Sequence, residues 1–181
     1  MGLGIISSFK KLMGGQRLDG RGVKILAPLT GDVIPLEDVP DVVFSEKLAG
    51  DGVAIKPSGK TIHAPLDGVV KFFESNHCFT VKAENGLEIL VHFGIDTVEL
   101  SGAGFKRLVE SGEKVTAGTP LIELDLPYLE ANAKSTITPV VISGSGDLRI
   151  SKVYLFEGRA TAGFTVIISV QLTEKNDADG S

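Results

Sequence analysis

The chain has 181 residues, of which 43% are hydrophobic and 23% are charged, and its formal net charge is −5. This composition fits one globular domain with a real hydrophobic core, and it excludes wholesale disorder and a coiled coil. The acidic balance, without a long cluster of lysine and arginine, argues against nucleic-acid binding. A single cysteine, Cys78, excludes an intrachain disulfide, so we expect a reducing, cytoplasmic location. The sequence has neither a signal-peptide pattern nor an apolar run of the roughly 20 residues that a membrane span needs.

Residues 1–22 differ from the rest of the chain and are predicted to form a separate amphipathic or flexible segment. Ile5, Phe9 and Leu12 fall at helical spacing, and Gly14-Gly15 ends the pattern. One interpretation is a frayed tail or a helix packed on its own domain. The other is weak contact of residues 1–13 with an anionic membrane surface. At the far end, the polar residues 173–181 are predicted to form a solvated tail.

Residues 23–172 are predicted to form one domain of short strands separated by turns. Val- and Ile-rich segments alternate with Gly and Pro, which is typical of antiparallel β-structure. Helical periodicity is scarce, and only residues 105–110 and 127–134 fit brief helices. We therefore expect an all-β fold, an antiparallel β-sandwich or flattened barrel with short helices. The clearest strand candidates are residues 32–34, 52–55, 68–73, 79–81, 87–91 and 165–170.

A five-residue word occurs twice in this domain. Ala27-Pro28-Leu29-Thr30-Gly31 returns as Ala64-Pro65-Leu66-Asp67-Gly68, each time before a strand candidate. The word is also ordinary turn chemistry, because Pro presets one turn position and Gly tolerates another. It therefore indicates either a duplicated unit or two similar turns.

Two of the three histidines flank one predicted hairpin. His77 precedes the segment 78–82 and His92 follows the segment 87–91, and Glu84-Asn85-Gly86 between them contains a strong hairpin signal. The loop length decides how the rings face each other, because a one-residue change of register inverts the faces. A two-residue turn makes the histidines diagonal neighbours and a four-residue loop places them directly opposite. A three-residue loop puts them on opposite faces.

Two close imidazoles suit three different roles. In phosphoryl transfer, one neutral ring nitrogen is the nucleophile and the other ring stabilises the charged oxygens. In a zinc site, two histidines need at least one more ligand. In a structural role, the rings only satisfy local hydrogen bonds. The neighbouring sequence adds the hydroxyl of Ser75, which can bond a histidine or a phosphoryl group, and four phenylalanines that form either core or an apolar docking surface: Phe72, Phe73, Phe79 and Phe93.

These residues lie in stretches that resemble the glucose-type IIA family of the bacterial sugar phosphotransferase system. The most specific stretch is Val91-His92-Phe93-Gly94-Ile95-Asp96-Thr97-Val98-Glu99-Leu100. The resemblance runs from about residue 25 to 143 and more loosely to 170, and it is poor from Ser143 to Asp147. The other stretches that carry it are residues 28–31, 37–44, 50–57, 76–79 and 134–141.

The resemblance implies an antiparallel β-sandwich of duplicated-hybrid type, in agreement with the repeated word. It also implies a phosphocarrier without an obligatory cofactor, in which a histidine takes a phosphoryl group from the carrier protein HPr. That group then passes to a cysteine on the IIB domain of a sugar permease. Carried over, His92 is the phosphoacceptor, His77 steadies the phosphoryl oxygens, and Ser75 stands where the family usually has threonine. The partner-binding positions carried over are Asp41, Val42, Val43, Phe73, Asp96 and Val98.

Relatives of this kind also regulate carbon uptake, so the resemblance implies further partners. The unphosphorylated form binds sugar permeases and glycerol kinase, and zinc shared by His77, His92 and a partner carboxylate can bridge the kinase contact. The phosphorylated form stimulates adenylate cyclase. A purely regulatory binding module without phosphoryl flux is the alternative function. A remote alternative is a zinc hydrolase of related fold, since His63 and Asp67 form a His-x-x-x-Asp pair, but Leu90 occupies the position of the third ligand.

Overall fold

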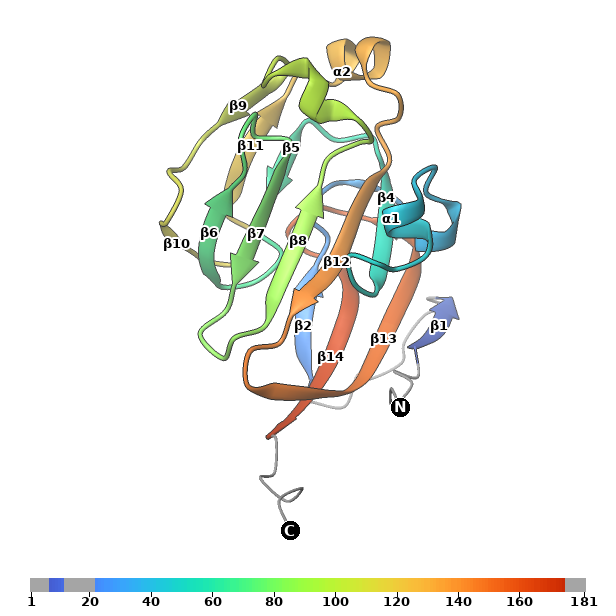
Figure 1. The fold of residues 1–181 in the computed structure, drawn as a ribbon, viewed down its shortest axis with the longest axis vertical. Helices are drawn as coiled ribbons and strands as arrows, with labels where there is room; N and C mark the ends of the chain where they lie inside the picture. Colours follow the sequence, from blue (N-terminus) through green and yellow to red (C-terminus); the bar gives the residue numbers. More distant parts are fainter. Residues whose placement is uncertain (1–6, 12–21, 175–181) are drawn as a thin grey trace.

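A curled sheet makes up most of the molecule (Figure 1). The structure is a computed structural model that describes residues 7–11 and 22–174. Within these residues the sheet has eleven strands, and every pair along its main path is antiparallel, which confirms the all-β antiparallel fold. In spatial order the path runs through β10 (Lys114–Val115), β6 (Gly68–Phe72), β7 (Cys78–Lys82), β8 (Glu88–His92), β12 (Thr138–Gly144), β4 (Gly52–Pro57), β3 (Gly31–Pro35), β13 (Leu148–Ala160), β14 (Val166–Glu174) and β2 (Val23–Leu26).

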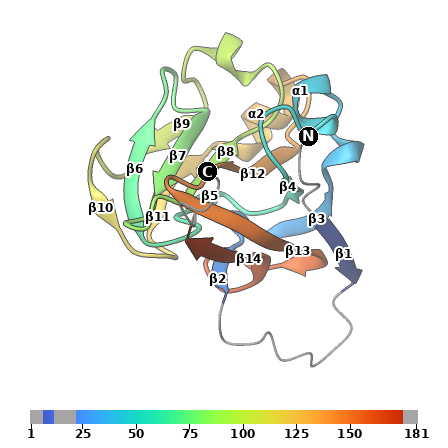
Figure 2. The same cartoon turned by 60° about the horizontal axis from the view of Figure 1, so that its bottom comes forward.

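A smaller antiparallel sheet packs against the β6–β8 part of the large one. It consists of β5 (Thr61–His63), β11 (Pro120–Leu124) and β9 (Phe105–Arg107). Phe105 of this sheet meets Phe93 edge to face, with ring centroids 5.4 Å apart. The helices are short and lie outside the strands (Figures 1 and 2). They are α1 (Val42–Ser45), α2 (Leu126–Asn132) and the 3-10 helices Leu36–Asp38 and Thr97–Leu100.

Two buried clusters hold these layers together. The larger one lies between the two sheets and includes the fully buried Phe79, Ile89 and Leu121. The smaller one lies beneath α1 and consists of Leu36, Val39, Phe44, Ala54, Ile95 and Val141. Since it contains one residue of α1 and one residue just after β8, this second cluster fixes α1 beside the end of β8.

The two copies of the five-residue word contact each other. The N–H of Leu26, just before the first copy, donates to the Pro65 carbonyl over 2.8 Å. The N–H of His63, just before the second copy, donates to the Pro28 carbonyl over the same distance. Each copy ends on the first residue of a strand, β3 or β6. This reciprocal arrangement favours the duplicated unit over two unrelated turns.

One of the two helices expected within the domain is a strand. The helix expected over residues 105–110 is wrong, because residues 105–107 form β9 and pair with β11. Phe105 is buried and Lys106 and Arg107 are exposed, and backbone pairing with β11 overrides the local helical spacing. The helix expected over residues 127–134 is confirmed as α2, one residue earlier at its start and two earlier at its end.

The amino-terminal segment also departs from helical geometry where it is described. Ser7–Lys11 forms β1, which pairs in parallel with residues 153–157 of β13. The open edge of β13 supplies the backbone groups that an added strand needs. The rest of the expected helix and the tail after residue 174 lie outside the described residues, so the domain limits at 22/23 and 172/173 stay predictions. None of the helices in the described part of the chain is long and apolar enough to cross a membrane.

Candidate functional site

The hairpin of β7 and β8 carries both histidines, in a register that the sequence left open. Cys78 pairs with His92, and Ala83 donates its N–H to the Leu87 carbonyl over 2.8 Å. The loop is therefore the three-residue one, residues 84–86, with Gly86 at a φ of 90° as such loops require.

The histidine rings nevertheless meet, so the expectation that a three-residue loop separates them is wrong. Their centroids are 4.9 Å apart at an interplanar angle of 80°. His77 lies just before β7, in a bend that follows Ser75 and Asn76, whose φ angles are 64° and 59°. Because His77 stands outside the regular strand, the alternation of faces does not direct its side chain.

The proton of His92 has a defined position. Its Nδ1 lies 2.8 Å from the carbonyl oxygen of Gly94. A carbonyl can only accept, so Nδ1 carries the hydrogen and donates it. In the neutral ring the lone pair is therefore on Nε2. Gly94, with a φ of 68°, provides the turn that brings its carbonyl back toward the ring.

The second ring is held by Ser75. The Ser75 hydroxyl lies 2.9 Å from Nδ1 of His77 and 2.6 Å from the Glu74 carbonyl. When the hydroxyl donates to Glu74, His77 carries its hydrogen on Nδ1. When the hydroxyl turns to donate to Nδ1, the hydrogen of His77 moves to Nε2. The structure therefore allows both tautomers of His77.

Both rings are kept neutral near pH 7. Burial lowers the pKa of His92 below its usual 6.5, against the opposite influence of the Gly94 carbonyl, Asp41 and Asp96. Burial, and then the charge of His92, lower the pKa of His77, and the Glu74 carbonyl opposes them. A neutral imidazole with a free Nε2 lone pair is a nucleophile, and a protonated one is not.

The expected partner-binding residues border this pair. Phe44 of α1 contacts the ring of His92 with centroids 5.3 Å apart, which places the exposed side chains of α1 at the site. Phe73 follows β6 and donates its N–H to the Cys78 carbonyl over 2.9 Å, and the 3-10 helix at Thr97 follows His92 closely. The apolar side chains at these places are 43–58% exposed: Val42, Val43, Phe73 and Val98.

Two carboxylates add negative charge beside the rings. Asp41 caps α1 and accepts the Val43 N–H over 2.9 Å. The negative charges of Asp41 and Asp96 both tend to raise the pKa of His92, although burial outweighs them. Asp96 also pairs with Lys134, whose Nζ lies 3.5 Å from its Oδ2. The site thus combines an apolar ring of side chains with two carboxylates, which suits a partner with an apolar face and positive charges.

Sequence reasoning missed three contributors to the site. Phe44 packs on His92, the Gly94 carbonyl fixes its tautomer, and Lys134 pairs with Asp96. Only Gly94 had a readable signal, since a glycine two residues after a histidine permits the chain to turn back on the ring. Phe44 lies 48 residues before His92 and Lys134 lies 42 residues after it, and only the fold brings them there.

The site offers two metal ligands and no more. Both Nδ1 atoms are engaged, so only the Nε2 atoms could bind a metal, and zinc needs at least a third ligand. In the described part of the chain, no three His, Cys, Asp or Glu side chains are grouped as a metal site. His63 lies in the small sheet with Nδ1 3.1 Å from the Thr61 carbonyl, and Asp67 accepts the Ala117 N–H. The His63–Asp67 pair therefore has local structural roles.

A comparison with known protein families covers the part of the chain that contains both histidines. A family model described as the phosphoenolpyruvate-dependent sugar phosphotransferase system, EIIA 1, matches residues 23–148. The chain belongs to this family. EIIA components transfer phosphoryl groups within that system.

Individual relatives agree with this assignment. The "PTS system glucose-specific EIIA component" of Haemophilus influenzae is 47% identical over 90% of this chain and 98% of its own length. The "PTS system N-acetylglucosamine-specific EIICBA component" of Escherichia coli is 48% identical over 82% of this chain, which spans only 23% of that longer protein. Among solved structures, the glucose permease IIA of Mycoplasma capricolum is similar with a TM-score of 0.75 and 34% identity. That similarity covers 84% of this chain and 99% of the solved one.

Proposed function

We propose that the chain is a phosphocarrier that accepts a phosphoryl group on Nε2 of His92 from phospho-HPr. It then passes the group to a cysteine on the IIB domain of a glucose-type sugar permease. The observation that carries this proposal is the bond from Nδ1–H of His92 to the Gly94 carbonyl, because it leaves the nucleophilic lone pair on Nε2. The names of the relatives support a glucose-type system, and the fused relatives support a permease as the acceptor.

Each transfer exchanges one bond to phosphorus for another. The Nε2 lone pair of His92 attacks phosphorus as the bond to the histidine nitrogen of HPr breaks, and the leaving nitrogen takes back its electron pair. On donation, a cysteine thiolate of the IIB domain attacks and the bond from Nε2 to phosphorus breaks. Throughout, the Gly94 carbonyl holds the Nδ1 proton. The protein's part is positioning and stabilisation of charge.

His77 acts on the phosphoryl oxygens. When the Ser75 hydroxyl donates to Nδ1 of His77, the ring presents an Nε2–H toward the neighbouring His92. That hydrogen can donate to an oxygen of the transferred group, where it stabilises the charge of the transition state. The rotating hydroxyl thus couples Glu74, Ser75 and His77 in one short relay.

The surroundings of the rings form the docking surface in this proposal. The four exposed apolar side chains of α1, Phe73 and Val98 exclude water around a labile bond. The carboxylates of Asp41 and Asp96 meet positive charges of HPr and of the IIB domain.

The same surface is expected to serve regulation. The unphosphorylated face binds sugar permeases and glycerol kinase, and zinc there would take Nε2 of His77, Nε2 of His92 and a carboxylate of the partner. A phosphoryl group adds about −1.5 to −2 charges to this apolar face and prevents that contact. The phosphorylated form is the one expected to stimulate adenylate cyclase.

Transfer from labelled phospho-HPr tests the assignment of both histidines. His92→Gln should take up no label, since an amide nitrogen has no available lone pair. His77→Gln should still take up label but pass it to the IIB domain more slowly, by about 10²-fold or more if a direct donor is lost. His63→Gln serves as the matched control and should behave as wild type. Labelled histidine in the His92→Gln variant would contradict the proposal.

A further inference from the structure

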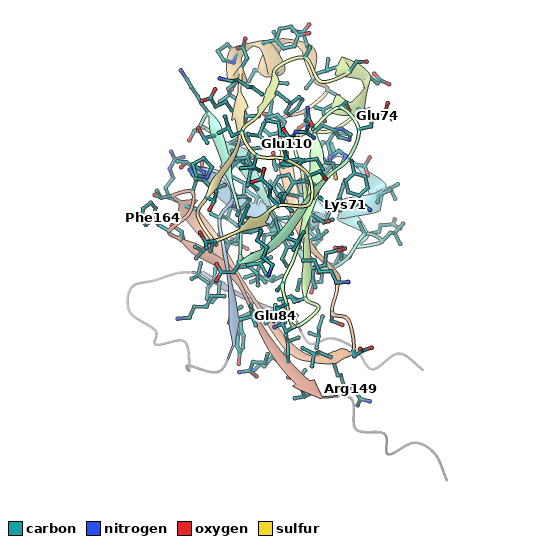
Figure 3. The ribbon with its side chains drawn as sticks, turned by 90° about the vertical axis from the view of Figure 1, so that its left-hand side faces the viewer. Lys71, Glu74, Glu84, Glu110, Arg149 and Phe164 are labelled. Carbon is teal, nitrogen blue, oxygen red and sulfur yellow. The ribbon has the colours of Figure 1, made fainter. Side chains whose placement is uncertain are left out.

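An open groove of about 890 Å³ lies far from the histidines. It is lined by the beginning of β6 and the end of β7, whereas the site lies at the end of β6 and the beginning of β7. β6 spans five residues, roughly 17 Å at about 3.3 Å per residue. In Figure 3, Glu74, which lies three residues before His77, is near the top, and Glu84, which lines the groove, is well below it.

The groove separates the two edges of the large sheet. β10 is the first strand of the path and β2 the last, and Figure 2 shows them apart from each other. Both contribute residues to the lining of the groove. The two sides of the groove meet at one point, where the Leu26 N–H of β2 donates to the Pro65 carbonyl just before β6. Elsewhere within the described residues 22–174, β2 is not paired with β10 or β6. Two residues earlier on the same strand, alternation directs the backbone N–H and carbonyl of Lys24 toward the groove. Among the described residues, no backbone partner for this N–H is found.

The lining of the groove carries excess positive charge over an apolar floor. Lys24, Lys82 and Lys114 come from three different strands and are all exposed. Its two acidic residues are Glu84 and Asp67, and the Asp67 carboxylate already accepts the Ala117 N–H over 2.7 Å. Val69 is 39% exposed and pairs with Lys82 of β7 and Lys114 of β10, so its side chain lies between these two lysines on one face of the sheet.

We propose that this groove binds an extended acidic segment of a partner protein as an added strand. The open edge at Lys24 offers a donor and an acceptor that only another backbone satisfies together. On the face that carries Val69, Lys82 and Lys114, Asp or Glu side chains of the segment meet the lysines, and the aliphatic stems of these side chains contact Val69. A simple anion would use the lysines and leave the backbone edge unpaired. Because the groove is remote from His92, the segment binds whether or not the chain carries a phosphoryl group.

Amide NMR spectra of the full-length chain test the proposal with a blocked pentapeptide of alternating glutamate and valine. We expect shifts at the amides of Lys24, Val69 and Lys114, and binding about five- to tenfold weaker in Lys24→Glu and Lys114→Glu. Lys60→Glu, an exposed lysine outside the groove, is the matched control and should bind as wild type. The peptide should leave the rate of phosphoryl uptake from phospho-HPr unchanged.

Four results would each overturn the proposal. The first is the absence of shifts at millimolar peptide, and the second is equal binding of a lysine–valine peptide. The third is the same pattern of shifts with inorganic phosphate alone, which would assign the groove to a small anion. The fourth is a change of these amides when residues 1–21 are removed without added peptide, which would assign it to the chain's own amino-terminal segment.

Discussion

The chemistry of the site depends on where two protons lie. The Gly94 carbonyl fixes the first one on Nδ1 of His92, so Nε2 is nucleophilic whenever the ring is neutral. The second is on His77 and moves with the Ser75 hydroxyl, which can donate to Glu74 or to the ring. One histidine therefore has a fixed tautomer and its neighbour has two. This difference suits an acceptor that needs a free Nε2 lone pair at all times, and a neighbour that can place a hydrogen on Nε2 when negative charge lies beside it.

Removal of the Ser75 hydroxyl tests this relay. In Ser75→Ala, acceptance by His92 should persist, because its own hydrogen bond is intact. Donation to the IIB domain should slow by roughly tenfold, less than the 10²–10³-fold typical of losing a direct donor. Single-turnover transfer from the phosphorylated chain measures it, with Ser75→Thr expected to restore the rate and Ser151→Ala as a remote control. Unchanged donation in Ser75→Ala would remove Ser75 from the mechanism.

At the scale of elements, two segments far apart in the chain fix the ends of the site. Lys47 pairs with Glu37 over 3.2 Å and with Asp51 over 3.1 Å, and this holds the end of α1 against its neighbours. The segment before β12 approaches from the other side, where Ile95 donates its N–H to the Ser135 carbonyl over 2.9 Å. Together they hold Phe44 and Gly94 against His92.

A methyl group at Gly94 should break this arrangement. A Cβ there would lie 2.5 Å from the Ser135 carbonyl oxygen, and its φ of 68° is unfavourable for alanine. We expect Gly94→Ala to lower the free energy of unfolding by roughly 2–4 kcal/mol. We also expect it to break the hydrogen bond from Nδ1 of His92 to the carbonyl of residue 94, so that the tautomer of His92 is no longer fixed. Gly112→Ala is the matched control, since its φ is 94° but nothing lies within 4 Å of the added carbon. It should lose only about 1 kcal/mol.

Urea denaturation of the two variants checks the difference in stability, and histidine NMR checks the tautomer. Equal losses for Gly94→Ala and Gly112→Ala would mean that contact with Ser135 is not what holds the carbonyl in place.

The sequence predicted the antiparallel strands better than the geometry of the two histidines. Short Val- and Ile-rich runs between Gly and Pro are enough to predict an antiparallel fold, and the block around His92 is enough to predict the family. The register of β7 and β8 was open, because Asn85-Gly86 permits loops of different length. Even the correct register misleads, since the left-handed Ser75 and Asn76 turn His77 out of the strand. Segments 105–107 and 7–11 became strands because neighbouring edges were available to pair with them.

At the scale of the whole molecule, the protein has two different ends. One end carries neutral histidines in an apolar ring with carboxylates beside it, and the other carries the groove with its lysines. The two ends are joined by the same strands, β6 and β7, within one continuous core. In the proposed function, we expect a phosphoryl group at the first end to change the local charge there.

The neutral histidines make the stability of the whole domain depend on pH. Both pKa values are lower in the folded chain than the usual 6.5, so the unfolded chain binds more protons as the pH falls through that region. The free energy of unfolding should therefore be fully retained at pH 7.5 and decrease by pH 5.5. Glu37 and Lys47 titrate outside this window. A backbone hydrogen bond, together with Lys47, lowers the pKa of Glu37 from 4.5. Against the effect of burial, Asp51 and Glu37 raise the pKa of Lys47 from 10.5.

Urea denaturation at the two pH values measures this dependence. A double variant, His77→Gln with His92→Gln, should show a smaller decrease between pH 7.5 and 5.5. The same decrease in wild type and double variant would show that other groups cause the pH dependence.

The most direct test of the account is the long-range proton–nitrogen NMR spectrum of the ¹⁵N-histidine-labelled chain before and after phosphorylation by phospho-HPr. We predict that His92 carries its hydrogen on Nδ1 in both states and gains the phosphoryl group on Nε2, while the signals of His77 report a change of environment. A phosphoryl group on Nδ1 of His92, or on His77, would contradict the mechanism derived from the Gly94 hydrogen bond.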